Sequence, residues 1–366
     1  MNYSLSKKIF SLNCRLDLND SMFCEILKEE LDLYPESSDN PNIVFTFTNS
    51  TKKFEFTLTN PKVHLSGKNF FGIENSNYSV VWIKNLGDHL LNVHVYLKPA
   101  KRSLKQVFSK FRNIQFTTFD ESAGQVFHEV LMTPSVYFFD NLFLIHGSAL
   151  VSPEGDAVIF GGTGGTGKTS SLLALGQKGW KFLSDDICVL DNNGNICPNY
   201  AYPKIYAYNT VGNKELEKKL LYKKGVINRF QWHFFKKISL SRVRRRIAPD
   251  ILYEVERSPK PLKRYYILSR GDYEKPKITK ISPEVSAEAS LRIIKSEYWV
   301  FNNHLYWHEF NQMIHGNKPV ITSNEVFNRW LSNMKKVLSN VDNFLVEIPR
   351  TFRHNEFLAF LVGVID

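Results

Sequence analysis

Alternating apolar and polar residues dominate the first third of the chain. Residues 44–48, 54–59 and 93–98 each alternate in this way, which is typical of β-strands with one buried face. The turn-forming dipeptide Asn60-Pro61 follows the second of these runs. The pattern predicts a β-rich N-terminal region, residues 1–120, built as an antiparallel sheet. We take substrate recognition as a hypothesis for its role.

Helix and strand patterns alternate along the remaining two thirds of the chain. Apolar residues at intervals of three and four predict helices, and short apolar runs predict strands. We expect helices over 121–132 (ending before Pro134), 170–175, 283–295 and 324–338, and strands over 157–160 and 263–269. The predicted fold class is α/β, with a mixed sheet and flanking helices over residues 121–366.

A glycine-rich run lies between the strand at 157–160 and the helix that follows. Residues 162–169 fit the phosphate-binding pattern G-x-x-x-x-G-K-[ST] at every required position. Glycines let backbone N–H groups turn toward phosphate oxygens where a Cβ would obstruct them. Lys168 is expected on the β/γ-phosphates and the Thr169 hydroxyl on Mg²⁺. The predicted nucleotide-binding residues are Gly162, Thr163, Gly164, Gly165, Thr166, Gly167, Lys168, Thr169 and Ser170.

Two adjacent carboxylates, Asp185 and Asp186, follow this loop inside an apolar, strand-like segment. A carboxylate at a strand end beside a phosphate loop is where a nucleotide-bound Mg²⁺ needs a ligand. The second carboxylate is then free to accept a proton from an attacking hydroxyl. His146 begins the strand that precedes the loop strand, so we expect it near the phosphates. The predicted catalytic residues are Asp185, Asp186, His146 and Lys168.

The order and spacing of these motifs resemble the HPr kinase/phosphorylase-like P-loop kinases, which include the C-terminal domain of HPr kinase. Their nucleotide core is related to phosphoenolpyruvate carboxykinase. The resemblance spans residues 125–205 and rests on His146-Gly147-Ser148-Ala149, the loop, and Leu183-Ser184-Asp185-Asp186. It implies a P-loop kinase core of this type that uses ATP and Mg²⁺.

The same resemblance implies roles for individual residues. Asp185 would be the general base, Thr169 and Asp186 would lie at the metal, and the two aspartate roles are interchangeable. His146 would approach the transferring phosphoryl group or the metal. The chain departs from the family at Gly164, where Ser is usual, and lacks the glutamate-containing signature of HPr kinase/phosphorylases. HPr itself is therefore not the expected substrate.

The sequence predicts an ATP- and Mg²⁺-dependent kinase that transfers the γ-phosphoryl group to a hydroxyl acceptor. The acceptor is a serine of a peptide or protein, or a small hydroxylated metabolite such as a sugar. One alternative is a non-catalytic nucleotide-binding regulatory or scaffold protein, and another is a carboxykinase-like decarboxylating enzyme. The kinase is favoured because a binding module has no need of a base.

Positive charge is concentrated in one segment. The whole chain carries a net charge of +11, whereas residues 204–280 alone hold 21 Lys and Arg against seven Asp and Glu. We interpret this segment as a basic insertion in the kinase domain, with its densest cluster at residues 242–246. It is either a solvated face or a docking surface for an acidic acceptor, an anionic membrane or a nucleic acid. Nucleic acid is the least favoured because no recognisable motif accompanies it.

Cysteine usage and hydropathy suggest a compartment. The four cysteines lack the spacing of a zinc site or a disulfide framework, so free thiols in a reducing compartment are expected. No apolar run approaches the roughly 18 residues of a membrane span. A cytoplasmic protein is therefore predicted, and a homo-oligomer is compatible with the sequence.

Overall fold

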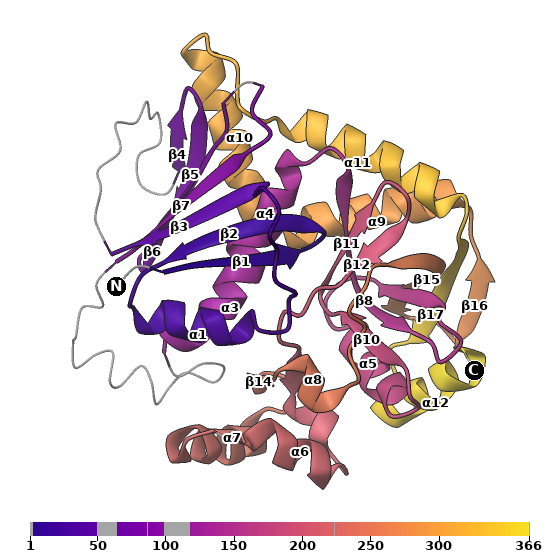
Figure 1. Cartoon of the computed structure of the whole chain (residues 1–366). Helices are drawn as coiled ribbons and strands as arrows, with labels where there is room; N and C mark the ends of the chain where they lie inside the picture. Colours follow the sequence, from indigo (N-terminus) through magenta and orange to yellow (C-terminus); the bar gives the residue numbers. More distant parts are fainter. Residues whose placement is uncertain (1–2, 50–63, 86, 99–117, 223, 366) are drawn as a thin grey trace.

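The computed structural model describes residues 3–49, 64–85, 87–98, 118–222 and 224–365. It is a mixed α/β protein whose two large sheets lie on either side of a central helical segment (Figure 1). The strand predicted at 54–59 lies outside the described residues.

The N-terminal sheet has seven strands in the order β1-β2-β3-β7-β6-β5-β4. The strands predicted at 44–48 and 93–98 are confirmed as β3 and β7. The sheet is mixed rather than antiparallel, because β2, β3 and β7 run parallel to one another. Helix α1 provides the crossover that a parallel β2–β3 pair requires. The elements are β1 Tyr3–Ile9, β2 Leu12–Leu18, α1 Met22–Glu30, β3 Ile43–Thr48, β4 His64–Gly67, β5 Phe70–Glu74, β6 Tyr78–Ile83 and β7 Leu91–Leu97.

The second sheet has eight strands, with the path β10-β8-β11-β12-β15-β17-β16, and β9 pairs with both β8 and β15. All ten residues of β8 are buried, as expected of a central strand covered on both faces. Its neighbours β9 and β11 run antiparallel to it. The strands are β8 Leu142–Val151, β9 Ala157–Gly161, β10 Lys181–Ser184, β11 Ile187–Asp191, β12 Asn195–Cys197, β15 Lys260–Gly271, β16 Lys277–Lys280 and β17 Asp342–Pro349.

Helices cover this sheet and extend toward the first one. The helices predicted over 283–295 and 324–338 are confirmed, with Ser282 and Thr322 as N-caps whose side chains accept backbone N–H bonds. The strand predicted over 263–269 is confirmed within β15. The helices are α5 Lys168–Gly176, α9 Pro283–Glu297, α10 Trp299–Ile314, α11 Ser323–Leu338 and α12 His354–Ile365.

The helix predicted to end before Pro134 continues through it. Helical turns run from η1 (Asp120–Ser122) through α3 (Ala123–Gln125), η2 (Val126–Met132), α4 (Thr133–Ser135) and η3 (Val136–Phe138). Residues of η2 adopt the wider π-helical pairing, which accommodates a proline that has no N–H to donate. The carbonyl of His128 accepts hydrogen bonds from both the backbone N–H and the hydroxyl of Thr133, the latter at 2.7 Å.

This helical segment joins the two sheets into one contiguous apolar core. Phe127 packs edge-on against Phe45 of the N-terminal sheet, with ring centroids 5.2 Å apart. Tyr137 packs in the same way against Trp330 of α11, at 4.6 Å. Packing therefore runs without a break from β3 to α11.

Residues 204–252 form a smaller unit, which we call the basic subdomain. Its elements surround a separate apolar cluster that contains Ile205, Leu220, Trp232 and Val243. The remainder of the predicted basic segment belongs elsewhere, since β15 and β16 are part of the eight-stranded sheet. The elements of the basic subdomain are β13 Lys204–Tyr206, η4 Ala207–Thr210, α6 Lys214–Leu221, α7 Val226–Ile238, β14 Arg244–Arg246 and α8 Pro249–Leu252.

The arginine cluster at 242–246 does not form one surface. Arg242 is exposed, whereas Arg245 and Arg246 are buried. The Arg245 guanidinium lies over the Trp232 ring, and Arg246 forms a bidentate ion pair with Glu30 of α1 (3.1 and 2.6 Å). Arg244 lines a pocket described below. Arg245 and Arg246 therefore have structural contacts, whereas Arg242 faces solvent and Arg244 faces the pocket.

Arg246→Ala is expected to destabilise the protein by about 3–5 kcal/mol, because it leaves the buried Glu30 carboxylate without its partner. Each side chain of this pair is only 7% exposed. Urea unfolding measures the change. The exposed Arg242→Ala is the control and should alter the free energy of unfolding by less than about 0.5 kcal/mol. Equal effects of the two substitutions would show that the Arg246–Glu30 pair does not tie α1 to the basic subdomain.

Candidate functional site

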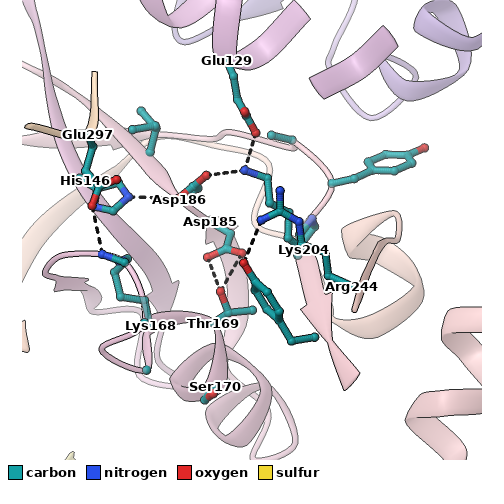
Figure 2. A pocket seen from close by; sticks show the side chains of 18 of the residues that line it. Glu129, His146, Lys168, Thr169, Ser170, Asp185, Asp186, Lys204, Arg244 and Glu297 are labelled. Atoms are coloured by element: carbon teal, nitrogen blue, oxygen red, sulfur yellow. Dashed lines mark hydrogen bonds and ion pairs between the residues drawn. The ribbon is translucent and has the colours of Figure 1, made fainter. Parts of the chain in front are cut away.

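A pocket of about 650 Å³ opens where the glycine-rich loop meets the middle of β8, the residues that follow β10, and β13 (Figure 2). Its walls also include the C-terminal end of α9 and the start of α12. Nine of the residues predicted from the sequence line it: His146, Gly164, Gly165, Gly167, Lys168, Thr169, Ser170, Asp185 and Asp186.

Backbone geometry explains why the loop is rich in glycine. Gly162, Gly165 and Gly167 have φ values of 139°, 78° and 115°, which L side chains rarely adopt. A Cβ on Gly162 would come within 2.6 Å of the Leu268 carbonyl oxygen, and one on Gly167 would meet the ring of Phe357. The strand predicted at 157–160 enters the loop as β9, and α5 begins directly after Gly167.

The Lys168 side chain folds back over this loop. Its Nζ donates to the carbonyls of Gly162 (2.9 Å) and Thr163 (2.8 Å). Burial lowers the pKa of Lys168, although the charges of Asp186, Asp185 and Glu297 partly oppose this. Gly162, Thr163 and Thr166 are not among the residues that line the pocket. They shape the loop, for example through the Thr166 hydroxyl, which donates to Thr163 O (3.0 Å).

A carboxylate already contacts the loop. Glu297, the last residue of α9, accepts a hydrogen bond from the Gly164 N–H through Oε1 (3.0 Å). The same oxygen lies 3.8 Å from His146 Nδ1. A carboxylate oxygen thus already accepts a hydrogen bond from one backbone N–H of the loop. N–H groups arranged in this way are typical of anion-binding sites.

Asp185 faces the start of α5. Its Oδ1 accepts a hydrogen bond from the Ser148 hydroxyl of β8 (2.5 Å), and the Thr169 hydroxyl lies 3.3 and 3.2 Å from its two oxygens. The residue is only 5% exposed. Burial raises the pKa of the Asp185 carboxyl, the neighbouring Asp186 charge adds to this, and Ser148 and Lys168 oppose it.

Asp186 faces the opposite way, into the pocket, and its side chain remains 44% exposed. Its Oδ1 lies 3.1 Å from His146 Nε2, and its Oδ2 accepts from Lys204 Nζ (2.9 Å). Its φ of +70° turns the chain sharply between β10 and β11, so that the two carboxylates diverge. Lys204 in turn pairs with Glu129 (2.5 Å).

Charge holds Asp186 ionised. Partial loss of hydration in the pocket raises the pKa of this carboxyl. The Lys204 ammonium and the His146 ring outweigh that effect and hold its pKa well below the ordinary value. Asp186 and Glu129 likewise raise the pKa of Lys204 against the effect of burial. Asp186 therefore carries a negative charge throughout the neutral range.

His146 lies between the glycine-rich loop and Asp186. Its Nδ1 lies 2.8 Å from the Gly162 carbonyl oxygen, and its Nε2 lies 3.1 Å from Asp186 Oδ1. The register of β8 against β11 pairs His146 with Ile187 and so brings it beside the two aspartates.

The other side of the pocket is cationic and aromatic. Arg244 donates to the Tyr206 hydroxyl (2.8 Å), and its guanidinium also lies over the Tyr206 ring. Arg270 and His354 line the same side. Sequence reasoning did not place Glu129, Glu297 or His354 at the site. Lys204, Arg244 and Arg270 lie within the basic segment that it marked as a possible docking surface, although it did not place them in this pocket.

The donor set beside the loop fits a hard cation. The Thr169 hydroxyl and the Asp185 carboxylate supply oxygen atoms of the kind that Mg²⁺ prefers. Within the described part of the chain, no three His, Cys, Asp or Glu side chains gather as a metal cluster. Over the same residues, no helix is both long and apolar enough to span a bilayer.

Comparison with known proteins adds no assignment: no protein-family model matches the sequence, and no curated protein matches it significantly.

Proposed function

We propose that this protein is an ATP- and Mg²⁺-dependent kinase of the HPr kinase-like P-loop type, which transfers the γ-phosphoryl group to a hydroxyl acceptor. The observation that carries the proposal is the convergence of the glycine-rich loop, the buried Lys168 and two differently held carboxylates in one pocket. The acceptor is a serine of a peptide or protein, or a small hydroxylated metabolite such as a sugar.

The loop and the start of α5 provide the phosphate-binding groups. The N–H groups of residues 163–168 and the Lys168 ammonium supply hydrogen bonds and positive charge to phosphate oxygens. Thr169 and one aspartate are the residues that would hold Mg²⁺. When bound, this ion supplies positive charge to the phosphoryl oxygens.

Geometry favours Asp185 as the metal-side carboxylate. Asp185 accepts a hydrogen bond from the Thr169 hydroxyl. The lone pairs of that hydroxyl oxygen therefore remain free to bind a cation. Asp186 is the aspartate that an acceptor hydroxyl can reach, since its side chain is open to the pocket. In identifying a general base, hydrogen-bonding distance to the acceptor hydroxyl is considered before the pKa of the carboxyl. The sequence left the two aspartate roles interchangeable. We therefore propose that Asp186 is the general base and that Asp185 lies at the metal.

The proposed reaction is a single displacement. The acceptor oxygen forms a bond to the γ-phosphorus, the bond from that phosphorus to the β–γ bridging oxygen breaks, and ADP leaves. The hydroxyl proton passes to the Asp186 carboxylate. A loose transition state needs little proton transfer before bond cleavage, so a carboxylate with a low pKa can serve. Lys204 and His146 then keep Asp186 in position.

The experiment that tests this function uses cell extract as the source of acceptor. Extract is incubated with the protein, Mg²⁺ and ATP labelled in its γ-phosphoryl group, and mass spectrometry identifies every molecule that gains the label. We expect a phosphorylated hydroxyl that is absent without the protein. ATP binding without any labelled product would instead support the non-catalytic regulatory or scaffold protein.

Glu297→Ala is expected to tighten ATP binding by about fivefold, because it removes an anion that competes for the Gly164 N–H. Isothermal titration calorimetry measures the dissociation constant. Glu288→Ala, on the same helix but outside the pocket, is the control and should leave the constant unchanged. Weaker binding by the Glu297 variant would mean that this carboxylate supports the nucleotide rather than competing with it.

A further inference from the structure

Helix α7 of the basic subdomain exposes a continuous apolar face. Its inner side is fixed by Trp232, which is fully buried in the subdomain core, and by Phe235, which packs against it. Five other apolar side chains point outward, with exposed fractions of 84, 52, 65, 49 and 68% for Val226, Ile227, Phe230, Phe234 and Ile238. Leu240, just beyond the helix, is 40% exposed.

These five residues share one side of the helix. At about 100° per residue they fall within an arc of about 120°, and Val226, Phe230, Phe234 and Ile238 succeed one another at four-residue steps. The rings of Phe230 and Phe234 are stacked, with centroids 6.0 Å apart. In Figure 1, α7 lies at the edge of the molecule, away from both large sheets. Large exposed apolar patches of this kind mark interaction sites.

Cations lie beside and within the apolar face. Arg229 and Lys237 of α7 are exposed; on the helical wheel Arg229 falls about 60° outside Val226, and Lys237 falls between Val226 and Phe230. The basic subdomain as a whole carries thirteen Lys and Arg against three Asp and Glu, a net charge of +10. Helix α7 therefore has one side packed on the subdomain and an exposed side on which apolar residues and cations lie together.

We infer that α7 docks the protein on the surface of an anionic phospholipid membrane. Its apolar side chains enter the boundary between headgroups and acyl chains, while Arg229 and Lys237 bind the lipid phosphates. Interfacial helices combine exposed aromatic and aliphatic residues with Lys and Arg in this way. Each cation near such a surface strengthens binding further.

An anionic membrane fits this surface of α7 better than a second copy of the protein or a nucleic acid does. A second copy would bring two subdomains of +10 together, and their repulsion opposes a dimer through α7. A nucleic acid matches the charge but gains little from exposed Val and Ile side chains, since its stacking partners are aromatic. An anionic bilayer matches both the charge and the apolar face.

The test is co-sedimentation of the full-length protein with vesicles of phosphatidylcholine, with and without phosphatidylserine. We expect binding to the vesicles that contain phosphatidylserine, weakened by salt, and little binding to phosphatidylcholine alone. The double variant Phe230→Ser/Phe234→Ser should bind at least about tenfold more weakly. Arg229→Glu should also weaken binding, and this variant keeps the apolar face intact because Arg229 lies outside the apolar arc.

The matched control is Trp299→Ser/Phe310→Ser, which removes two exposed aromatic side chains from α10. It should bind vesicles as the unchanged protein does. Equal binding to both kinds of vesicle, equal loss in the control, or no binding at low salt would each overturn the inference. So would a dimer that the Phe230→Ser/Phe234→Ser variant converts to monomer without any binding to vesicles, because α7 would then contact a second copy.

Discussion

Asp186→Asn is expected to lower the rate of phosphoryl transfer by about 10²- to 10⁴-fold while leaving the affinity for ATP nearly unchanged. The amide keeps the shape of the side chain but cannot accept the hydroxyl proton. It also loses the charge that Lys204 and His146 are arranged to hold. Single-turnover kinetics with labelled ATP separate the chemical step from nucleotide binding.

Asp185→Asn is the matched control for this prediction. It should raise the Mg²⁺ concentration needed for half-maximal activity, since Asp185 is the carboxylate beside Thr169. The pH profile gives a second discriminator. With Asp186 as base, the acidic limb of kcat/KM lies below the ordinary carboxyl value of 3.8, because its pKa is depressed. A limb above that value, with the larger loss of rate in Asp185→Asn, would restore Asp185 as the base.

Lys168→Met has the second largest expected effect, a loss of transfer rate of about 10²- to 10³-fold. The substitution removes the ammonium that faces the loop but retains an apolar stem of similar length. Because burial already lowers the pKa of Lys168, removing its charge should not unfold the protein. Nucleotide binding should weaken together with the rate.

Calorimetric titration with ATP and steady-state kinetics measure both effects of the Lys168 substitution. Lys178→Met, at the exposed end of the segment that follows α5, serves as the control and should behave as the unchanged protein. An unaltered ATP affinity and rate in Lys168→Met would mean that this lysine only ties the loop together through Gly162 and Thr163.

Local sequence signals predicted the parts of the site that lie close together along the chain. The loop, its entering strand and its helix follow from glycine spacing and apolar runs, and Ser282 gave the start of α9. Glu297 enters the pocket from an element far away in the sequence. No local pattern marks it, because its position depends on how α9 packs against β8.

Two errors of the sequence analysis have the same origin. Pro134 normally ends a helix, but the tertiary contacts of Phe127 and Tyr137 on either side keep this segment helical. The run at 242–246 looks like a cationic surface, yet Arg246 finds a buried partner in Glu30, more than 200 residues earlier. In both cases long-range packing outweighs a local preference.

The most direct test of the central claim compares the unchanged protein with Asp186→Asn in one labelling experiment. Both proteins are incubated with γ-labelled ATP, Mg²⁺ and the same cell extract, and label on the acceptor is quantified. We predict a labelled hydroxyl product with the unchanged protein and almost none with the variant, while both bind ATP equally. Equal labelling by the two proteins, or ATP binding with no labelled product from either, would contradict the account.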